Sequence, residues 1–366
     1  MSVASAETGE LPADGPEEKK PKSVFARVTG SWILRRFLKF VLTIFVVATL
    51  TFFLVRLLPG NPVDTFIQTQ MQQTGMSHAD AAAMAQGLFS FNPNEPVLQQ
   101  YATYMTNLLH GDLGTSLLSP GTTVAQVIRI YLPWTLFSVG VAQIIAFVLG
   151  VLAGMLMAYR RGSWVDHLLT NLGSFLHAIP NYILAILIVV FLGVKLQVFD
   201  LTSMRGSYSP GVHPNFSIDF LSDALYHATL PILAYVLTTV GTWALVMKSS
   251  TVETLGEDYV TVARARGLAE PRIVFGYVGR NAVLPLFSQL AVTFGFVVGG
   301  SILVEKIFSY QGIGAQLFTS INGRDYPVMQ GIFLVIAVSV VTANLVADLL
   351  YSRLDPRIRV AGSERE

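Results

Sequence analysis

The run IYLPWTLFSVGVAQIIAFVLGVLAGMLMAY, at residues 130–159, contains no Asp, Glu, Lys or Arg. About 20 apolar residues in a helix are enough to cross the roughly 30 Å hydrocarbon core of a bilayer. The run therefore predicts a transmembrane helix. Charge-free runs that reach this length follow at residues 167–194, 224–247, 281–304 and 326–347.

A shorter apolar run, residues 40–55, comes before these five. Phe37 and Leu38 extend it past Lys39, whose amine can reach the membrane interface along its apolar stem. Only 13% of the chain is charged, against about 25% in a typical soluble domain. We therefore expect an all-α polytopic membrane protein with six transmembrane helices.

The positions of Lys and Arg predict the orientation, because cytoplasmic loops carry an excess of basic residues. With the N-terminus in the cytoplasm, all but six of the 24 Lys and Arg residues fall on the cytoplasmic side. The six on the other side are Arg56, Arg129, Lys195, Arg205, Lys306 and Arg324. The sequence thus predicts a multi-pass protein of the plasma (inner) membrane with both termini in the cytoplasm.

Five regions follow from this topology. Residues 1–31 are polar and rich in Glu, Lys and Pro, a composition typical of a disordered cytoplasmic tail. We expect the first transmembrane helix at residues 32–59, an extracytoplasmic segment at residues 60–131, a five-helix core at residues 132–355, and a cytoplasmic tail at residues 356–366. The extracytoplasmic segment should contain a helix at residues 95–109, where apolar residues recur at helical spacing.

A polar, Arg-rich loop at residues 251–280 interrupts the core on the cytoplasmic side. Within EDYVTVARARGL, which begins at residue 257, one helical face carries Tyr259, Val262, Ala263 and Arg266. Gly267 lies where a helix C-terminus takes the left-handed conformation. Pro271 suits the first turn of a second helix, because its missing N–H is not needed there. The loop therefore predicts two helices joined by a sharp corner.

This loop resembles the coupling loop of ABC importer permeases, in particular the peptide-type branch that carries oligopeptides, dipeptides or nickel. The general family pattern is Glu-Ala-Ala, three residues, then Gly; here Thr261, Val262 and Ala263 precede Gly267. The departure at Thr261 and Val262 itself resembles the peptide-type branch. Further stretches that resemble this branch are LLPGNP at 57–62, GDLGTSL at 111–117, RRGSW at 160–164, FSYQGIG at 308–314 and DYPV at 325–328.

The resemblance implies a type I ABC importer permease fold and a function in moving short peptides by alternating access. It implies four kinds of partner: a second homologous permease subunit, two ATPase subunits, an extracytoplasmic substrate-binding protein and membrane lipid. ATP and Mg would bind on the ATPase subunits, so no cofactor is expected in this chain, and nucleic acid is not an expected partner. The coupling helix that would dock on an ATPase comprises Glu257, Asp258, Tyr259, Val262, Ala263, Arg264, Ala265, Arg266 and Gly267.

Glycine and proline residues inside the spans suggest how the helices pack. Gly150 and Gly154 are four residues apart, as are Gly295 and Gly299, and this spacing lets helix backbones approach closely. Packing within the chain is the favoured interpretation, with a dimer interface as the alternative. Pro180 should kink the third span.

Motifs for catalysis are absent from the sequence. It contains no GxxxxGK[ST] phosphate loop, no HExxH metal pattern and no cysteine, so we expect neither ATP hydrolysis nor a metal site. An intramembrane hydrolase that uses Ser174 and His177 remains an alternative, as does a permease for nickel or another small solute. A proton-coupled carrier would need charges deep in the spans, and the five charge-free runs have none. Glu305, next to Lys306, is interpreted as a solvated residue at an outer span end.

The topology can be tested with introduced cysteines, because the chain has none of its own. A cysteine at Thr122 should react with an impermeant thiol reagent in intact cells, whereas cysteines at Ser5 and Ser363 should stay unlabelled until the membrane is breached. Labelling of the Ser5 position in intact cells would contradict the predicted orientation.

Overall fold

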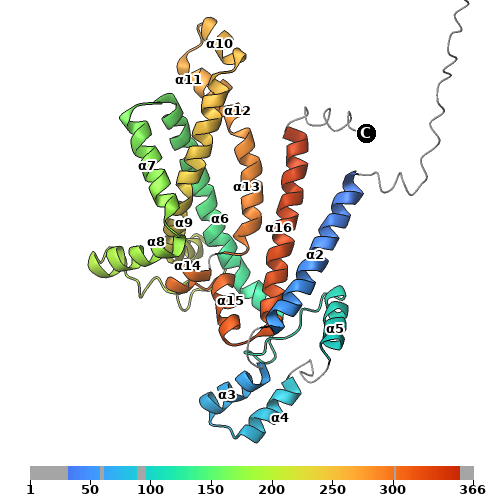
Figure 1. Ribbon diagram of the computed structural model, residues 1–366. Helices are drawn as coiled ribbons and strands as arrows, with labels where there is room; N and C mark the ends of the chain where they lie inside the picture. The colour runs from blue at the N-terminus through green and yellow to red at the C-terminus, as the bar shows by residue number, and fades with distance from the viewer. Residues whose placement is uncertain (1–31, 58–61, 89–95, 301, 355–366) are drawn as a thin grey trace, which may run out of the picture. The chain divides into compact units, whose positions relative to one another are not determined.

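A computed structural model of the 366-residue chain describes residues 32–57, 62–88, 96–300 and 302–354. Contacts divide the chain into two units, residues 1–42 and residues 43–366. Of the first unit, the structure describes the opening turns of helix α2. The residues described in the second unit form helices (Figure 1), and the extended pairing among them is a single bridge between Thr115 and Thr123.

The helices follow one another along the chain, and the longest described connections are residues 110–123, before α6, and residues 196–217, before α9. Their bounds are α2 Trp32–Arg56, α3 Pro62–Thr74, α4 His78–Leu88, α5 Val97–Leu109, α6 Val124–Tyr159, α7 Trp164–Ala178, α8 Asn181–Leu187, α9 Ile218–Leu255, α10 Asp258–Ala265, α11 Glu270–Arg272, α12 Arg280–Ala282, α13 Leu284–Val297, α14 Ile302–Ile307, α15 Ile313–Asn322 and α16 Tyr326–Leu354. Two π-helical segments, Ile188–Lys195 and Ile273–Gly279, continue α8 and α11. Helix α6 therefore begins before the expected start of the core at residue 132.

Four helices in the described part of the chain are long and apolar enough to cross a membrane. They comprise Phe37–Arg56, Val124–Tyr159, Ile218–Leu255 and Tyr326–Ala347. A fifth candidate is the pair Trp164–Ala178 and Asn181–Lys195, which is bent by 99°. A shorter apolar helix, Leu284–Val297, has 14 residues, fewer than the roughly 20 that a span needs. The structure thus gives four or five spans by length, where the sequence predicted six.

The third predicted span is broken, not merely kinked. Ile179 has the extended conformation (φ −83°, ψ 121°) that a following proline imposes. Pro180 also supplies no N–H to the preceding turn. Helix α7 therefore ends at Ala178, and α8 starts in a new direction, crosswise to α7 in Figure 1.

The fifth predicted span ends earlier than residue 304. Its helix α13 ends at Val297, and Gly300 has a positive φ of 55°, a conformation that glycine adopts without steric cost. The short helix α14 then begins at Ile302. The apolar run continues through this break, and for this reason the sequence pattern alone did not reveal it.

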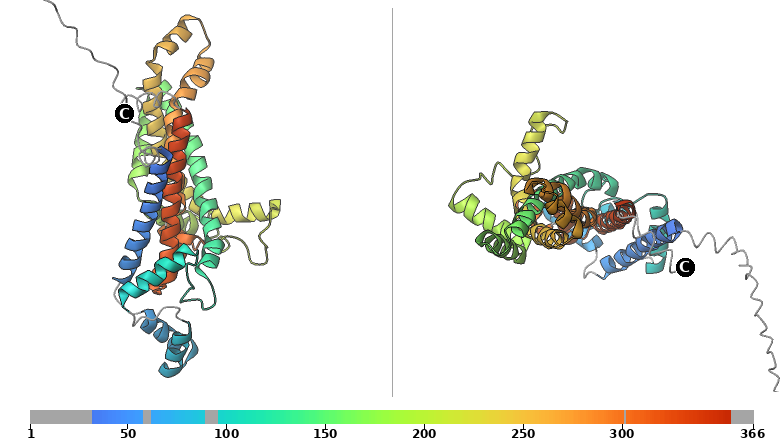
Figure 2. Two further views of the ribbon diagram at one scale, coloured as in Figure 1. Left: turned by 90° about the vertical axis from the view of Figure 1, so that its right-hand side faces the viewer. Right: turned by 90° about the horizontal axis from the view of Figure 1, so that it is seen from above.

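Helices α6 and α9 pack along each other, and α13 packs against α16 (Figures 1 and 2). A Cβ at Gly154 would lie 2.6 Å from that of Met247 on α9, and one at Gly295 would lie 3.0 Å from the Cα of Val340 on α16. A Cβ at Gly150 would overlap the Cβ of Trp243 on α9. A Cβ at Gly299 would lie 3.7 Å from the nearest atom of another helix, which is an ordinary van der Waals contact. Three of the four glycines thus contact another helix of the same chain closely.

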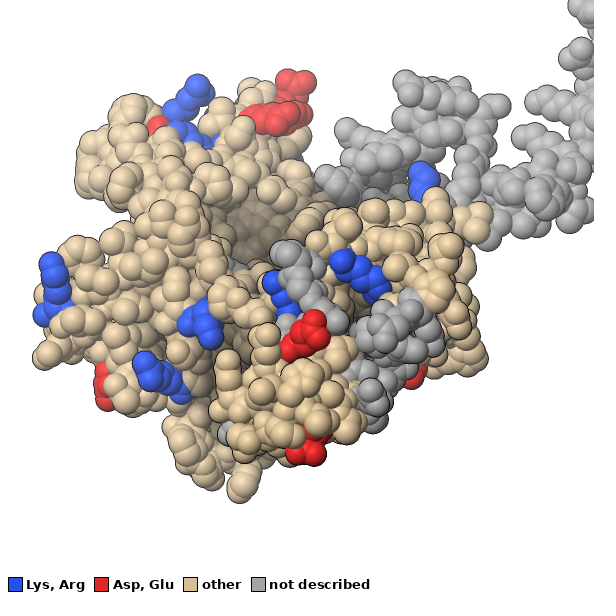
Figure 3. All heavy atoms as spheres, turned by 60° about the horizontal axis from the view of Figure 1, so that its bottom comes forward, with Lys and Arg blue, Asp and Glu red and all other residues tan. Residues whose placement is uncertain are grey.

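Asp325 joins two stretches far apart in the sequence. Its buried carboxylate accepts hydrogen bonds from the Ser116 hydroxyl and from the backbone N–H of Leu117 (3.1 Å) and Leu118 (3.2 Å). The segment that leads into α6 is thereby fixed to the start of α16. Charged side chains are otherwise few and dispersed over the face shown in Figure 3.

Glu305 is completely buried, so its interpretation as a solvated residue is wrong. Its carboxylate accepts hydrogen bonds from the Thr135 hydroxyl (2.6 Å) and the Ala315 N–H (2.9 Å). Gly312 and Gly314 leave the space that it occupies, because a Cβ at Gly312 would overlap the carboxylate. The carboxylate therefore connects α6, α14 and α15 from the inside.

Burial raises the pKa of Glu305 to about 7, above the roughly 4.3 of an unfolded chain. Its contribution to stability is thus full below about pH 4.5 and is lost as the pH rises through 7. Glu305→Gln should reduce the loss of unfolding free energy between pH 4.5 and 7.5 by on the order of 1–3 kcal/mol. Denaturation in mild detergent at several pH values measures this slope, with the exposed Lys306→Gln as control. Equal slopes for wild type and Glu305→Gln would contradict the assignment.

Candidate functional site

The Arg-rich loop forms a folded unit at the end of the bundle where α9 ends and α13 begins (Figure 1). Gly256 ends α9, and Glu257, with extended backbone (φ −73°, ψ 144°), precedes α10. Helix α11 starts with Glu270 and Pro271. The chain thus forms two helical segments joined at a corner, in the order that the sequence suggested.

Gly267 makes the corner by a specific set of hydrogen bonds. Its φ is 71°, and its N–H donates to the Arg264 carbonyl (2.9 Å) while the Leu268 N–H donates to the Ala263 carbonyl (3.3 Å). These two bonds are the Schellman motif, which satisfies carbonyls at a helix C-terminus and needs a left-handed residue. An L-residue with a side chain pays a steric cost in this conformation.

The loop has a small core of its own. Val260 and Ala263 of α10 are buried against Ile273 and Val278, and Leu268 packs beside them. Ala263 therefore lies on the inner side, whereas Tyr259 and Val262, which the sequence pattern placed on the same helical face, are exposed. The helical spacing was predicted correctly. Which face of α10 is buried depends on Ile273 and Val278, against which the helix packs.

Other side chains of the predicted docking helix face outward. Tyr259 is 38% exposed and Val262 is 57% exposed. The Tyr259 hydroxyl accepts a hydrogen bond from Asn281 (3.1 Å), and the exposed Arg264 pairs with Glu270 (3.3 Å). The remaining exposed members are Glu257, Asp258, Ala265, Arg266 and Gly267.

Phe275 is a surface residue that the sequence analysis did not select. It lies in the π-helical segment Ile273–Gly279 and is 65% exposed. An aromatic side chain within a loop of many charges was a usable signal, although it did not show which way the ring would point. Together Tyr259, Val262 and Phe275 give this polar loop three exposed apolar side chains.

A second feature is a polar cleft of about 420 Å³ at the break between α7 and α8. Four parts of the bundle contribute to it: α6, the break with its Pro180, α9 and α13. Its polar lining includes Gln143, His177, Asn181, Thr239, Thr242 and Gln289. Among the described residues that line the cleft, none is Lys, Arg, Asp or Glu.

Helices α7 and α9 come together beside this cleft at two glycines. A Cβ at Gly241 would overlap the carbonyl of Gly173, so the backbones are in direct contact. Thr242, next to Gly241, and His177, one turn after Gly173, join the same two helices by a hydrogen bond of 2.9 Å between Oγ1 and Nδ1. The sequence analysis missed the glycine pair because its members come from different helices and form no local motif.

The hydrolase alternative receives no geometric support from this bond. The His177 Nδ1 atom is paired with Thr242, and Ser174 is an exposed residue of α7. A nucleophilic serine needs a base within hydrogen-bond reach that is itself held by a third group. The group that holds the His177 ring is the hydroxyl of Thr242, which is neutral and not a carboxylate.

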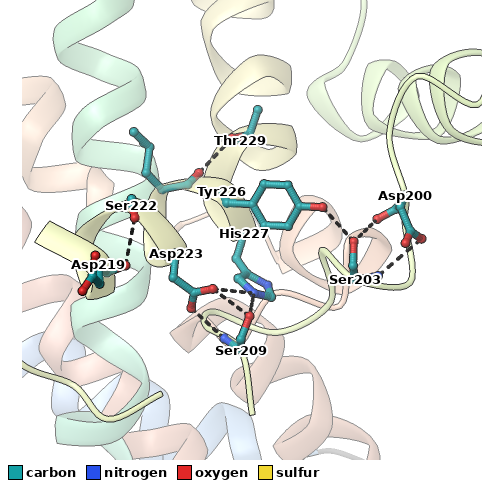
Figure 4. A network of polar contacts seen from close by, with 10 residues as sticks. Asp200, Ser203, Ser209, Asp219, Ser222, Asp223, Tyr226, His227 and Thr229 are labelled. Carbon is teal, nitrogen blue, oxygen red and sulfur yellow. Dashed lines mark hydrogen bonds and ion pairs between the residues drawn. The ribbon is translucent and has the colours of Figure 1, made fainter. Parts of the chain in front are cut away.

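A Ser–Asp–His cluster does occur at the start of α9 (Figure 4). Ser209 donates from its hydroxyl and from its N–H to Asp223 (both 2.7 Å), and its Oγ lies 3.1 Å from Nε2 of His227. The carboxylate thus holds the serine, whereas in a catalytic triad it would hold the far nitrogen of the histidine. That nitrogen, His227 Nδ1, is buried without a hydrogen-bond partner. The cluster fixes the loop before α9 to that helix.

Groups of three or more His, Cys, Asp or Glu side chains in metal-binding positions do not occur among the described residues. Asp200, in the loop after α8, is an acidic residue that binds backbone N–H groups. Its carboxylate accepts hydrogen bonds from the N–H groups of Thr202 (2.9 Å) and Ser203 (3.4 Å). These bonds hold the pKa of Asp200 below its usual value.

Comparison with known proteins gives consistent results. Residues 150–360 match the family described as binding-protein-dependent transport system inner membrane component. The oligopeptide transport system permease protein AppB of Bacillus subtilis (strain 168) is 32% identical over 90% of this chain and 99% of its own length. The di/tripeptide transport system permease protein DppB of Pseudomonas aeruginosa (strain UCBPP-PA14) is also 32% identical, over 90% and 98%.

A third relative is named for a different substrate. The glutathione transport system permease protein GsiC of Salmonella paratyphi A (strain ATCC 9150 / SARB42) is 32% identical over 90% of this chain and 99% of its own length. These matches extend over nearly the whole length of each relative. The chain belongs to the family of binding-protein-dependent transport system inner membrane components and is a non-catalytic, multi-pass permease subunit of an ABC importer.

Proposed function

We propose that the chain forms half of a translocation pathway for short peptides and that separate ATPase subunits drive it through α10. The observation that carries this proposal is the folded unit around Gly267. Its own core and its Schellman corner make it stiff, while Tyr259 and Val262 remain exposed for a partner. The relatives named for oligopeptide, di/tripeptide and glutathione transport support a short peptide as the substrate.

The proposed topology keeps six transmembrane segments. Helices α12 and α13 are separated only by Val283, whose backbone is helical (φ −79°, ψ −18°) and whose N–H donates to the Gly279 carbonyl (3.1 Å). Residues 280–297 thus form one helical path of roughly 27 Å at 1.5 Å per residue. The bent pair α7 and α8 supplies the remaining segment.

The proposed orientation places the loop of α10 and both termini in the cytoplasm. Basic residues of the loop, such as Arg264 and Arg266, agree with this side of the membrane. The helices α3, α4 and α5 then belong to the extracytoplasmic segment, within reach of a substrate-binding protein. A second permease subunit completes the path, and two ATPase subunits bind ATP and Mg.

Uptake measurements test this function. Deletion of the gene should abolish import of labelled di- and tripeptides, and the wild-type gene should restore it. Uptake of glutathione and of Ni²⁺ is measured in parallel. If the chain is a permease for either solute, the deletion strain should lose uptake of that solute instead. Unchanged peptide uptake in the deletion strain, with loss of another solute, would contradict the proposed substrate.

Docking on the ATPase should depend more on apolar contact than on charge. An exposed ion pair such as Arg264–Glu270 contributes about 0.2–1 kcal/mol, whereas truncating an aromatic anchor in an interface can cost about 2 kcal/mol or more. Tyr259→Ala should therefore release the ATPase from a purified complex at lower salt than Arg264→Ala does. The amount of ATPase that remains bound is measured as salt is raised.

Tyr259→Phe is the matched control, because it keeps the ring and loses only the hydrogen bond with Asn281. It should retain the ATPase as wild type does. Release by Arg264→Ala together with retention by Tyr259→Ala would mean that the docking is electrostatic.

A further inference from the structure

A cavity of about 290 Å³ lies apart from both the Arg-rich loop and the polar cleft. Four parts of the chain enclose it: the last turn of α2, helix α5, residues 112–117 and the start of α16 (Figure 1). Its volume is at the lower end of the range of small-molecule sites, about 300–1,000 Å³. The cavity can therefore hold a small ligand or a headgroup.

The walls of this cavity are held together without a ligand. Two stretches selected in the sequence analysis, GDLGTSL at 111–117 and DYPV at 325–328, contribute to them. The buried carboxylate of Asp325 accepts hydrogen bonds from the Ser116 hydroxyl and the Leu117 N–H. The loop is thus fixed to the start of α16, and the cavity is preformed.

The cavity lies at the depth of lipid headgroups. One apolar span ends at Arg56 and another begins at Tyr326, and both residues line the cavity. The polar layer of a bilayer starts where the apolar part of a span ends. Leu57 and Leu98, each next in sequence to a lining residue, are 78% and 75% exposed. Apolar side chains therefore accompany the polar walls, as at the boundary between headgroups and acyl chains.

Gln330 of α16 contributes a hydrogen-bond donor that the chain does not use. It lines the cavity and is only 6% exposed, and its amide nitrogen is buried without a hydrogen-bond partner. Such a donor is costly to leave unsatisfied. A ligand oxygen in the cavity would remove this cost.

Arg56 brings a positive charge to the same cavity. Its Nε and Nη2 donate to Oε1 of Gln100 (3.1 and 3.0 Å), and its Nη1 donates to the Phe52 carbonyl (3.2 Å). These bonds position the planar guanidinium at the wall. A guanidinium matches the paired oxygens of a phosphate or carboxylate, so the ligand group near Arg56 and Gln330 should be an oxyanion.

Asp112 adds a negative charge to the lining. One of its carboxylate oxygens accepts the Gly114 N–H (2.8 Å), and a carboxylate has room for further donors. Among the described lining residues, Arg56 and Asp112 are the charged ones. A ligand with one charge of each sign therefore fits the cavity better than a purely anionic one.

We propose that this cavity binds the headgroup of a zwitterionic phospholipid, with its phosphate against Arg56 and Gln330 and its amine against Asp112. The phosphate oxygens accept from the guanidinium and the amide, and the ammonium donates to the carboxylate. The bound lipid joins α2, α5 and α16 at the membrane surface. This site goes beyond the proposed function, and its test needs no transport measurement.

The test is retention of lipid by the purified, assembled complex. The complex is stripped of lipid with detergent and titrated with phosphatidylethanolamine, and bound lipid is counted by native mass spectrometry. Gln330→Leu, which removes the amide with little change of volume, should bind the lipid about tenfold more weakly than wild type. Gln316→Leu is the matched control, because it makes the same change on α15 outside the cavity. Absence of bound lipid in wild type, or equal binding by Gln330→Leu, overturns the proposal.

The headgroup is tested with phosphatidylglycerol, which has the phosphate but no amine. Wild type should bind it about fivefold more weakly than phosphatidylethanolamine. Asp112→Asn should remove this preference, because it loses the charge but keeps an oxygen for the Gly114 N–H. Equal binding of the two lipids by wild type overturns the contact with the amine. Displacement of the lipid by inorganic phosphate would assign the cavity to a free anion and overturn the lipid as its ligand.

Discussion

Direct contact between helix backbones is the constraint on which the rest of this bundle depends. Lipid is as apolar as a leucine side chain, so helices in a membrane gain little from hydrophobic burial and must instead pack closely. Gly154 lets α6 approach α9 at Met247, and the pair Gly173 and Gly241 brings α7 against the same helix. Helix α9 is therefore held on two sides, and its threonines near Gly241 have a fixed position relative to α6 and α7.

The buried carboxylates of Glu305 and Asp325 also hold together segments that are far apart in the sequence. Each accepts hydrogen bonds from groups distant in the sequence: Glu305 from Thr135, and Asp325 from Ser116. A buried carboxylate is costly unless such donors surround it, so the segments around it must fold together.

The sequence predicted the features that are encoded locally, and it failed where a distant partner decides. Charge-free runs located the apolar helices, and Gly267 and Pro271 located the corner of the loop, because turn conformation depends on the residue itself. The inward side of α10 could not be predicted, since Ile273 and Val278 select Ala263 for burial. Glu305 was misplaced for the same reason: its neighbour Lys306 is exposed, while its donors come from residues 135 and 315. The cleft has no sequence motif, because it combines single polar residues from four separate parts of the chain.

The connection from the loop to the cleft is unequal on its two sides. Toward α9 the helix is interrupted, because the chain passes through Gly256 and the extended Glu257. Toward α13 it remains helical from Ile273 to Val297, and the Ser250 hydroxyl holds this path to α9 by a bond to the Ala282 carbonyl (2.7 Å). The inner core of α10 is therefore packed against the same helical path that leads into α13. Helix α13 in turn carries Gln289, one of the polar residues that line the cleft.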